Sequence, residues 1–130
     1  MLHPKQFTVN EAWIAFRLND APIETDADGA FNCIALMDAA SCFILGSEFI
    51  SVNTSEPSEL EFYRLLKQGQ NHKHQLPQTL FVALEQSAAP IAEIAKRQGI
   101  HVIEVLECEL DIFIGDARDG FRERFGKSEA

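Results

Sequence analysis

The sequence lacks the features that mark membrane and secreted proteins. No window reaches the ~18 uninterrupted apolar residues that a membrane-spanning helix needs. Residues 1–6, Met-Leu-His-Pro-Lys-Gln, lack the apolar stretch of a secretory signal. The three cysteines, Cys33, Cys42 and Cys108, are an odd number without a Cys-x-x-Cys pair, as expected of core thiols in a reducing compartment. These absences predict a cytoplasmic protein without a membrane segment.

Basic residues are also scarce. The chain has 11 Lys and Arg against 20 Asp and Glu, a formal net charge of −9. Proteins hold nucleic acids largely by neutralising phosphates with Lys and Arg, so this charge disfavours nucleic-acid binding and suits a basic partner or simple solubility. The one local group of arginines, Arg118, Arg122 and Arg124, alternates with Asp119 and Glu123. That alternation is typical of a solvated helix face.

Motifs for cofactor binding and nucleophilic catalysis are missing as well. The chain has no Gly-x-Gly-x-x-Gly, no P-loop and no Gly-x-Ser-x-Gly. His72 and His74 have no neighbouring cysteine or carboxylate and are typical of an ordinary loop rather than a metal site. The acidic run Glu24–Gly29 lacks the downstream glutamate and the flanking helices of an EF-hand, so we interpret it as a solvated turn.

The stretch that is present and most informative is a pair of apolar runs. At 130 residues and 46% hydrophobic, the chain is expected to form a single domain, 1–130, with residues 1–10 as a flexible N-terminal segment. The runs Phe31–Met37 and Cys42–Val52 flank the short segment Asp38–Ser41. They predict a β-hairpin whose turn is stabilised by the side chains of Asp38 and Ser41.

The rest of the chain alternates strand and helix patterns. The apolar density of Trp13–Leu18 predicts a first strand, although a helix from Asn10 is an alternative. After the hairpin, the predicted elements are a helix over about 57–68 ended by Gly69, a polar loop over 70–77, a strand Thr79–Leu84, a helix Ala88–Gln98, a strand Ile100–Leu106 and a helix on Leu110, Ile114, Ala117, Phe121 and Phe125. The order of elements is βββαβαβα.

This succession resembles the ribonuclease H-like architecture. The similar stretch runs from about Leu18 to Val105 and has the spacing and texture of the catalytic core of retroviral integrases and DDE transposases. It comprises Leu-Asn-Asp-Ala-Pro at 18–22, a connector ending at Gly29, a strand entering the small-residue turn 38–41, the pair Leu65-Leu66, the strand 79–84 and Gly99-Ile100. The resemblance implies an α/β fold with a ribonuclease H-like mixed sheet.

The chemistry of that family needs three carboxylates that converge on a metal pair. Asp20 matches the first position. Glu85 stands where the family has an aspartate in an Asp-Asn-Gly-like setting, but the Asn-Gly is missing. The third carboxylate would come from the last helix, where Glu109, Asp111, Asp116 and Asp119 all qualify; we take Asp111. Because Mg²⁺ requires near-ideal octahedral geometry, this incomplete match puts catalysis in doubt.

Position in the sheet singles out the same residues without reference to a family. Ligands of open α/β sheets bind beyond the carboxyl ends of the strands. Asp20 follows the first predicted strand and Glu85 the fourth, so the two carboxylates could share a crevice and bind a divalent cation or act as acid and base. The alternative is a turn aspartate and a solvated glutamate. We expect His101 to be a partly buried core histidine, and the core to contain Trp13, Phe31, Phe43, Phe49 and Phe81.

The function predicted from the sequence is that of a cytoplasmic, non-catalytic domain without a cofactor, which binds a protein or a small ligand. The exposed edge of the hairpin's outer strand could pair with a second copy, giving a homodimer. The alternative is a Mg²⁺- or Mn²⁺-dependent nuclease or phosphoryl transferase. Its catalytic residues would be Asp20, Glu85 and Asp111, with Asp20 and Glu85 as metal ligands.

Overall fold

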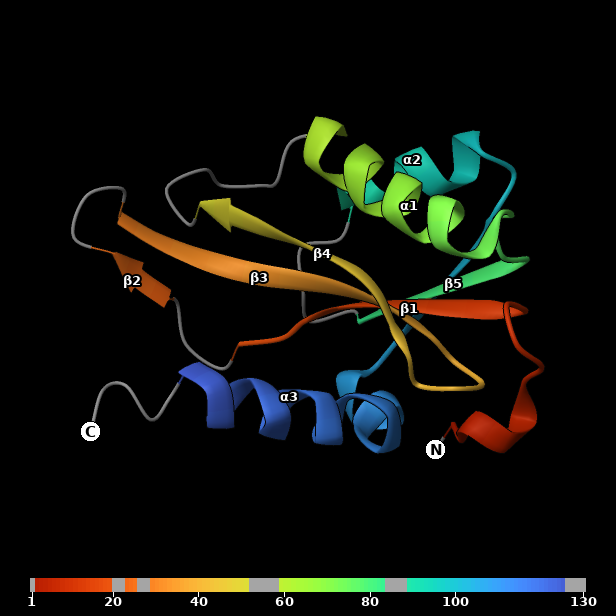
Figure 1. Cartoon of the computed structure of the whole chain (residues 1–130). Helices are drawn as coiled ribbons and strands as arrows, with labels where there is room; N and C mark the ends of the chain where they lie inside the picture. The colour runs from red at the N-terminus through yellow and green to blue at the C-terminus, as the bar shows by residue number, and fades with distance from the viewer. Residues whose placement is uncertain (1, 20–22, 26–28, 52–58, 84–88, 126–130) are drawn as a thin grey trace.

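The computed structural model describes the chain except residues 1, 20–22, 26–28, 52–58, 84–88 and 126–130 (Figure 1). Within the described residues, the elements are the 3₁₀-helix η1 (Pro4–Gln6), strands β1 (Ala12–Arg17), β2 (Ile23–Thr25), β3 (Gly29–Asp38) and β4 (Ile44–Ser51), helix α1 (Glu59–Lys73), strand β5 (Thr79–Ala83), helix α2 (Ala89–Arg97), strand β6 (His101–Val105), the 3₁₀-helix η2 (Glu107–Leu110) and helix α3 (Asp111–Phe125). No described helix is long and apolar enough to cross a membrane.

The strands form one mixed sheet. Central β1 pairs antiparallel with β3 and parallel with β5, which pairs parallel with β6. Phe31 of β3 pairs with both Ile23 of β2 and Ser51 of β4, so β2 and β4 lie on opposite edges of β3. The order across the sheet is therefore β4-β3-β1-β5-β6, with β2 continuing the line of β1. This arrangement confirms the predicted ribonuclease H-like fold and the strand at β1.

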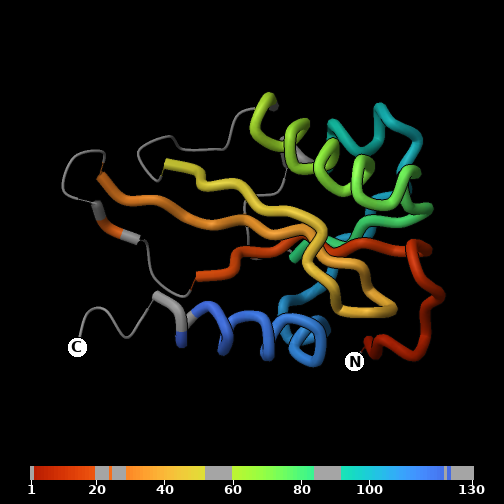
Figure 2. The backbone as a smooth tube through the Cα atoms, viewed as in Figure 1, coloured from red at the N-terminus to blue at the C-terminus, as the bar shows by residue number. Residues whose placement is uncertain are grey.

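The predicted hairpin is confirmed by β3 and β4, which run side by side as the longest strands, with 10 and 8 residues (Figure 2). The register shifts between Leu36 and Met37, where Leu45 is the extra residue on β4. The sequence did not predict β2, which overlaps the first two residues of the segment Glu24–Gly29 that we interpreted as a solvated turn. Its ends, Ile23 and Thr25, are β-branched and pair with Phe31 and Gly29, which favours extended backbone over a turn.

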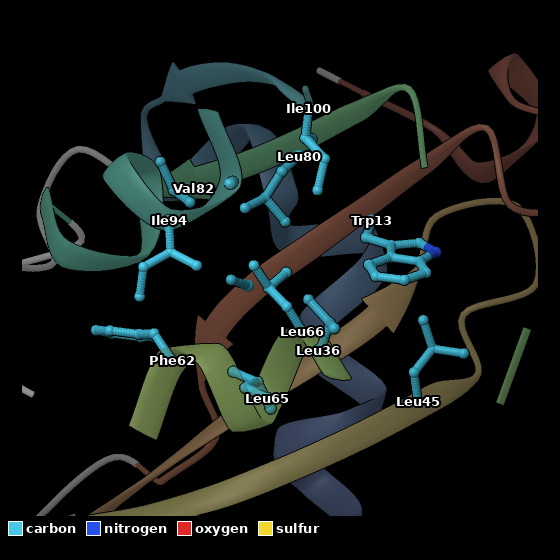
Figure 3. Packing of buried hydrophobic residues seen from close by; sticks show 12 residues of the cluster. Trp13, Leu36, Leu45, Phe62, Leu65, Leu66, Leu80, Val82, Ile94 and Ile100 are labelled. Carbon is cyan, nitrogen blue, oxygen red and sulfur yellow. The ribbon is translucent and has the colours of Figure 1, made fainter. Parts of the chain in front are cut away.

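Helices cover both faces of the sheet. Helices α1 and α2 lie over one face and α3 over the other (Figure 1). Trp13 and Ala15 of β1 belong to the core beneath α1 and α2, where Phe62, Leu65 and Ile94 also pack (Figure 3). The alternate residues of β1 belong to the core beneath α3: Ala12, Ile14 and Phe16. A strand buried on both faces reads as a continuous apolar run, which is the pattern that predicted it.

Helix α1 is longer than predicted, because Gly69 does not end it. The helix continues to Lys73, and His74 follows with a left-handed φ of 65°. Gly69 is buried, and a Cβ there would lie 2.9 Å from both Leu36 Cδ2 and Trp13 Cη2. This glycine therefore permits close packing of the helix on the sheet, and residues 70–73, predicted as loop, form the last helical turn.

The N-terminal segment packs beside α3. The ring of Phe7 lies 5.6 Å from that of Phe81 and 6.2 Å from that of Phe113, and Leu2 N–H donates to the carbonyl of Glu109 at 3.2 Å. Leu2 and Phe7 thus add to the core beneath α3, near the amino end of β1.

Two of the five aromatic residues predicted to be core are exposed. Trp13 and Phe81 are buried and Phe31 is half-buried, but Phe43 is 50% and Phe49 53% exposed. Strand β4 lies at the edge of the sheet, and Phe49 is paired with Cys33 on the face opposite to α1. His101, predicted to be partly buried, is exposed at the start of β6. Edge position accounts for Phe49 and His101, because β4 and β6 each have a neighbouring strand on one side only, whereas Phe43 lies between the hairpin turn and the start of β4.

Candidate functional site at the carboxyl ends of the parallel strands

The carboxyl ends of β1, β5 and β6 lie at one edge of the sheet, where ligands bind in folds of this kind. The described residues that follow these strands are Leu18 and Asn19 after β1, and Leu106 and Glu107 after β6. Asp20 and Glu85, the two predicted metal ligands, lie outside the described residues. The described geometry of this edge comes from the residues around them.

Arg118 of α3 is the side chain that reaches this edge. Its Nε and Nη2 donate hydrogen bonds of 3.0 and 2.9 Å to the carbonyl oxygen of Arg17, the last residue of β1. Its Nη1 forms an ion pair with Oε1 of Glu107, just after β6. The Arg118 side chain is only 16% exposed. Because β5 lies between β1 and β6, this one guanidinium bridges the ends of the strands on either side of β5.

Asn19 fixes the same end of β1 to β3. Its Oδ1 accepts a 2.7 Å hydrogen bond from the backbone N–H of Cys33, and its Nδ2 donates to Oδ1 of Asn32 at 3.0 Å. Leu18 N–H donates to the carbonyl of Cys33 at 2.8 Å. The buried Asn19 side chain thus extends the ladder between β1 and β3 by one step, up to the residue that precedes Asp20.

The late carboxylates do not gather at this edge. Asp111, predicted as the third catalytic residue, is exposed at the first position of α3. It lies seven residues before Arg118, about 10 Å along the helix axis. Asp116 acts on the thiol of Cys42 in the hairpin turn, where it helps to raise the pKa. Asp119 is exposed and Glu109 half-buried.

The described part of this edge does not fit a metal pair. Among the described residues, no three His, Cys, Asp or Glu side chains lie close enough together to hold a metal ion. Glu107, the carboxylate at the end of β6, is paired with Arg118. A fixed guanidinium beside divalent cations would be repelled by them.

A second polar cluster lies at the opposite end of β1, around Asp38. This carboxylate is fully buried, as 0% of the residue is exposed. Its Oδ1 accepts a 2.7 Å hydrogen bond from Asn10 N–H, and its Oδ2 accepts from Ser41 N–H at 3.0 Å and Ser41 Oγ at 2.7 Å. Asn10 Oδ1 in turn accepts from Trp13 Nε1 at 2.7 Å. Asp38 therefore stabilises the hairpin turn, as predicted.

Two thiols near these clusters, Cys33 and Cys42, have raised pKa values. Burial raises the pKa of Cys33, and a hydrogen bond with Ser47 partly opposes this shift. Burial also raises the pKa of Cys42, with further increases from the negative charges of Asp38 and Asp116. Raised pKa values keep both thiols protonated and so make them poor nucleophiles at neutral pH.

Comparison with solved structures supports the fold. A chain of the simian T-cell lymphotropic virus intasome in complex with PP2A regulatory subunit B56 gamma matches with a TM-score of 0.60 at 9% identity, over 88% of this chain and 39% of that one. The catalytic core domain of BIV integrase matches with a TM-score of 0.58 at 11% identity, over 92% and 72% of the two chains. The HTLV-2 integrase catalytic core domain in complex with magnesium matches with a TM-score of 0.53 at 11% identity, over 84% and 82%.

The fold is therefore similar to that of retroviral integrase catalytic cores, as the sequence resemblance predicted. The chain spans well under half of the intasome chain that it matches, at 39%. No protein-family model matches the sequence, and no curated protein sequence is significantly similar.

The charge pattern of the sequence did not indicate that Arg118 belongs to this edge. Its alternation with Asp119 and Glu123 was interpreted as a solvated face, but Arg118 is directed at the sheet. A weak signal was present in its spacing: Arg118 lies four residues after the buried Ile114, so helical periodicity places both on neighbouring parts of one face. Charge alternation alone does not show which members of a run face inward.

Proposed function

We propose that this chain is a non-catalytic binding domain that retains an integrase-like fold without a working metal centre. The observation that carries the proposal is the Arg118 bridge. In a two-metal site, carboxylates share the divalent cations, and the resemblance to integrase cores implies that they stand at the carboxyl ends of strands and on the last helix. Here the last helix brings a guanidinium to that place, and the guanidinium also engages the carboxylate of Glu107.

The partner that we propose is a protein. Seven large apolar side chains among the described residues are exposed, two of them phenylalanines on or next to edge strand β4. The net charge of −9 argues against nucleic acid and in favour of a neutral or basic protein surface. The cysteines Cys33, Cys42 and Cys108 are free thiols, which supports a cytoplasmic location.

The alternative function is a Mg²⁺- or Mn²⁺-dependent nuclease or phosphoryl transferase that uses Asp20, Glu85 and Asp111. The likeness to integrase catalytic cores favours it. This alternative requires Asp20 and Glu85 to bind metal beside the Arg118 bridge, which makes it directly testable.

Metal-dependent thermal stability separates the two functions. A metal at about 100 times its dissociation constant would stabilise the fold by about 2.7 kcal/mol, a shift of several degrees in Tm. We expect no such shift with millimolar Mg²⁺ or Mn²⁺, and no cleavage of single- or double-stranded DNA or RNA. A stabilisation that disappears in Asp20→Asn but persists in the control Asp119→Asn, together with metal-dependent cleavage of nucleic acid, would establish the enzyme instead.

A further inference from the structure

The outer edge of β4 is open at Phe49. The backbone N–H and C=O of Cys33 point towards β1, because they bond to Asn19 Oδ1 and Leu18 N–H. In an antiparallel ladder, when the backbone groups of one residue point away from its opposite residue, those of the opposite residue also point away from it. Phe49 is opposite Cys33, so the N–H and C=O of Phe49 point away from β3, towards the open edge of β4. Of the described strands, only β3 pairs with β4.

Two residues earlier on the same edge, the side chain of Gln68 stands in for a neighbouring strand. Its Oε1 accepts a 3.0 Å hydrogen bond from Ser47 N–H, and its Nε2 donates to the carbonyl of Ser47 at 3.2 Å. A carboxamide that engages both backbone groups of one residue reproduces the two hydrogen bonds that an opposite residue of an adjacent antiparallel strand would make. Nε2 also lies 3.3 Å from Oε1 of Glu48.

The strand is shaped to receive this side chain. A Cβ on Gly46 would lie 2.7 Å from the Cβ of Gln68, a distance that real contacts do not reach. The absence of a side chain at Gly46 is therefore what lets Gln68 lie across β4. Natural proteins protect open edges in such ways because unpaired strands template association.

We propose that the outer edge of β4 is a pairing surface for β4 of a second copy of this chain. Gln68 restrains this pairing, because its side chain already forms hydrogen bonds with the backbone N–H and C=O of Ser47. The inference names the partner of the binding domain proposed above and rests on that proposal. Because the test of self-association involves no metal ion, its result can refute the proposed partner without refuting the proposed absence of catalysis.

The edge is complementary to itself. If two β4 strands pair antiparallel about a two-fold axis at Phe49, each Phe49 faces its own copy and exchanges two backbone hydrogen bonds with it. Ser47 then faces Ser51 of the second copy, and Glu48 faces Ile50. No like charges are directly opposite, and aromatic pairs are favourable across strands. Ser47 is held back, because its backbone groups already bond to Gln68.

Sedimentation equilibrium of four forms tests the proposal: wild type, Gln68→Ala, the control Gln70→Ala, and Gln68→Ala combined with Phe49→Pro. Gln70 lies on the same helix, and its side chain contacts Lys67 rather than β4. Proline at 49 removes an N–H that points away from β3, so the ladder to β3 is kept while edge pairing is blocked. Circular dichroism confirms that each form is folded.

We expect Gln68→Ala to lower the dimer dissociation constant roughly tenfold or more relative to wild type, since it frees two backbone groups on each copy. Gln70→Ala should match wild type, and Phe49→Pro should abolish the gain. Hydrogen exchange should show a concentration-dependent protection of the Phe49 amide in Gln68→Ala. Equal association of Gln68→Ala and wild type overturns the restraining role, and persistent dimerisation with Phe49→Pro overturns the pairing surface.

Discussion

At each end of β1, a charged side chain inside the fold is held by partners of the protein, but the two charges have opposite signs. At the amino end, the buried carboxylate of Asp38 accepts hydrogen bonds from Asn10 and Ser41. At the carboxyl end, the guanidinium of Arg118 donates to the carbonyl of Arg17 and pairs with Glu107. Each cluster holds a charged group inside the fold, where an unpaired charge would be costly. Each also ties β1 to a different part of the chain.

The difference between these ends bears on function. The buried acid, the kind of residue expected at a metal site, stabilises a hairpin turn. At the edge of the sheet where ligands bind, the half-buried guanidinium of Arg118 forms an ion pair with the carboxylate of Glu107. The carboxylate of Glu107 at the end of β6 is thus already paired with a cation of the protein itself.

The largest effect should come from breaking the amino end with Asp38→Ala. The substitution leaves the N–H groups of buried Asn10 and exposed Ser41 without the acceptor that the fully buried Asp38 provides. We expect a loss of about 3–4 kcal/mol in the free energy of unfolding, measured by urea denaturation. The control Asp111→Ala removes an exposed aspartate and should change stability by less than about 0.5 kcal/mol. A similar, small loss in both variants would show that Asp38 does not anchor the turn.

Arg118→Met, which removes the polar contacts of Arg118 at the carboxyl end of β1, should lower the free energy of unfolding by less than Asp38→Ala does. The variant keeps much of the apolar stem but loses two hydrogen bonds to Arg17 and the ion pair with Glu107. Because Glu107 is partly exposed and can be solvated, we expect a loss of about 2 kcal/mol. Arg64→Met, on the exposed surface of α1, is the matched control and should be nearly neutral.

A double-mutant cycle sharpens this comparison. If Arg118 and Glu107 act as a pair, the loss in Arg118→Met combined with Glu107→Gln should be less than the sum of the two single losses. Additive losses would mean that Arg118 acts through the carbonyl of Arg17 alone.

The fold was predictable because its signals are local. The continuous apolar runs of β1 and β5 indicate strands buried on both faces, and Gly99, with a left-handed φ of 83°, ends α2 as predicted. Gly69 misled because a glycine that ends a helix and a glycine that permits close packing look alike in sequence. Contact with Trp13 and Leu36 decides between them, and that contact is tertiary.

The site was less predictable because its contacts are distant in the chain. Asp38 and Ser41 are three residues apart, so their hydrogen bond follows from turn chemistry. Arg118 and Arg17 are separated by 101 positions. No local pattern indicates that the guanidinium crosses from the last helix to the end of the first strand. Asp20 and Glu85 remain predictions.

The smallest effect concerns Cys42, which reports on the electrostatics near the amino end of β1. Burial and the charges of Asp38 and Asp116 raise its pKa, so its thiolate forms at higher pH than that of an unfolded thiol, about 8.5. Because the thiol of the unfolded chain ionises at lower pH, protonation of Cys42 favours the folded state. This contribution to the free energy of unfolding is present below the pKa of the unfolded thiol and is lost as the pH rises through the pKa of the folded thiol. Peptide mapping of alkylation against pH should show Asp116→Asn lowering the pKa of Cys42, while Asp111→Asn leaves it unchanged. An equal response to both would mean that the overall charge, and not the proximity of Asp116, acts on this thiol.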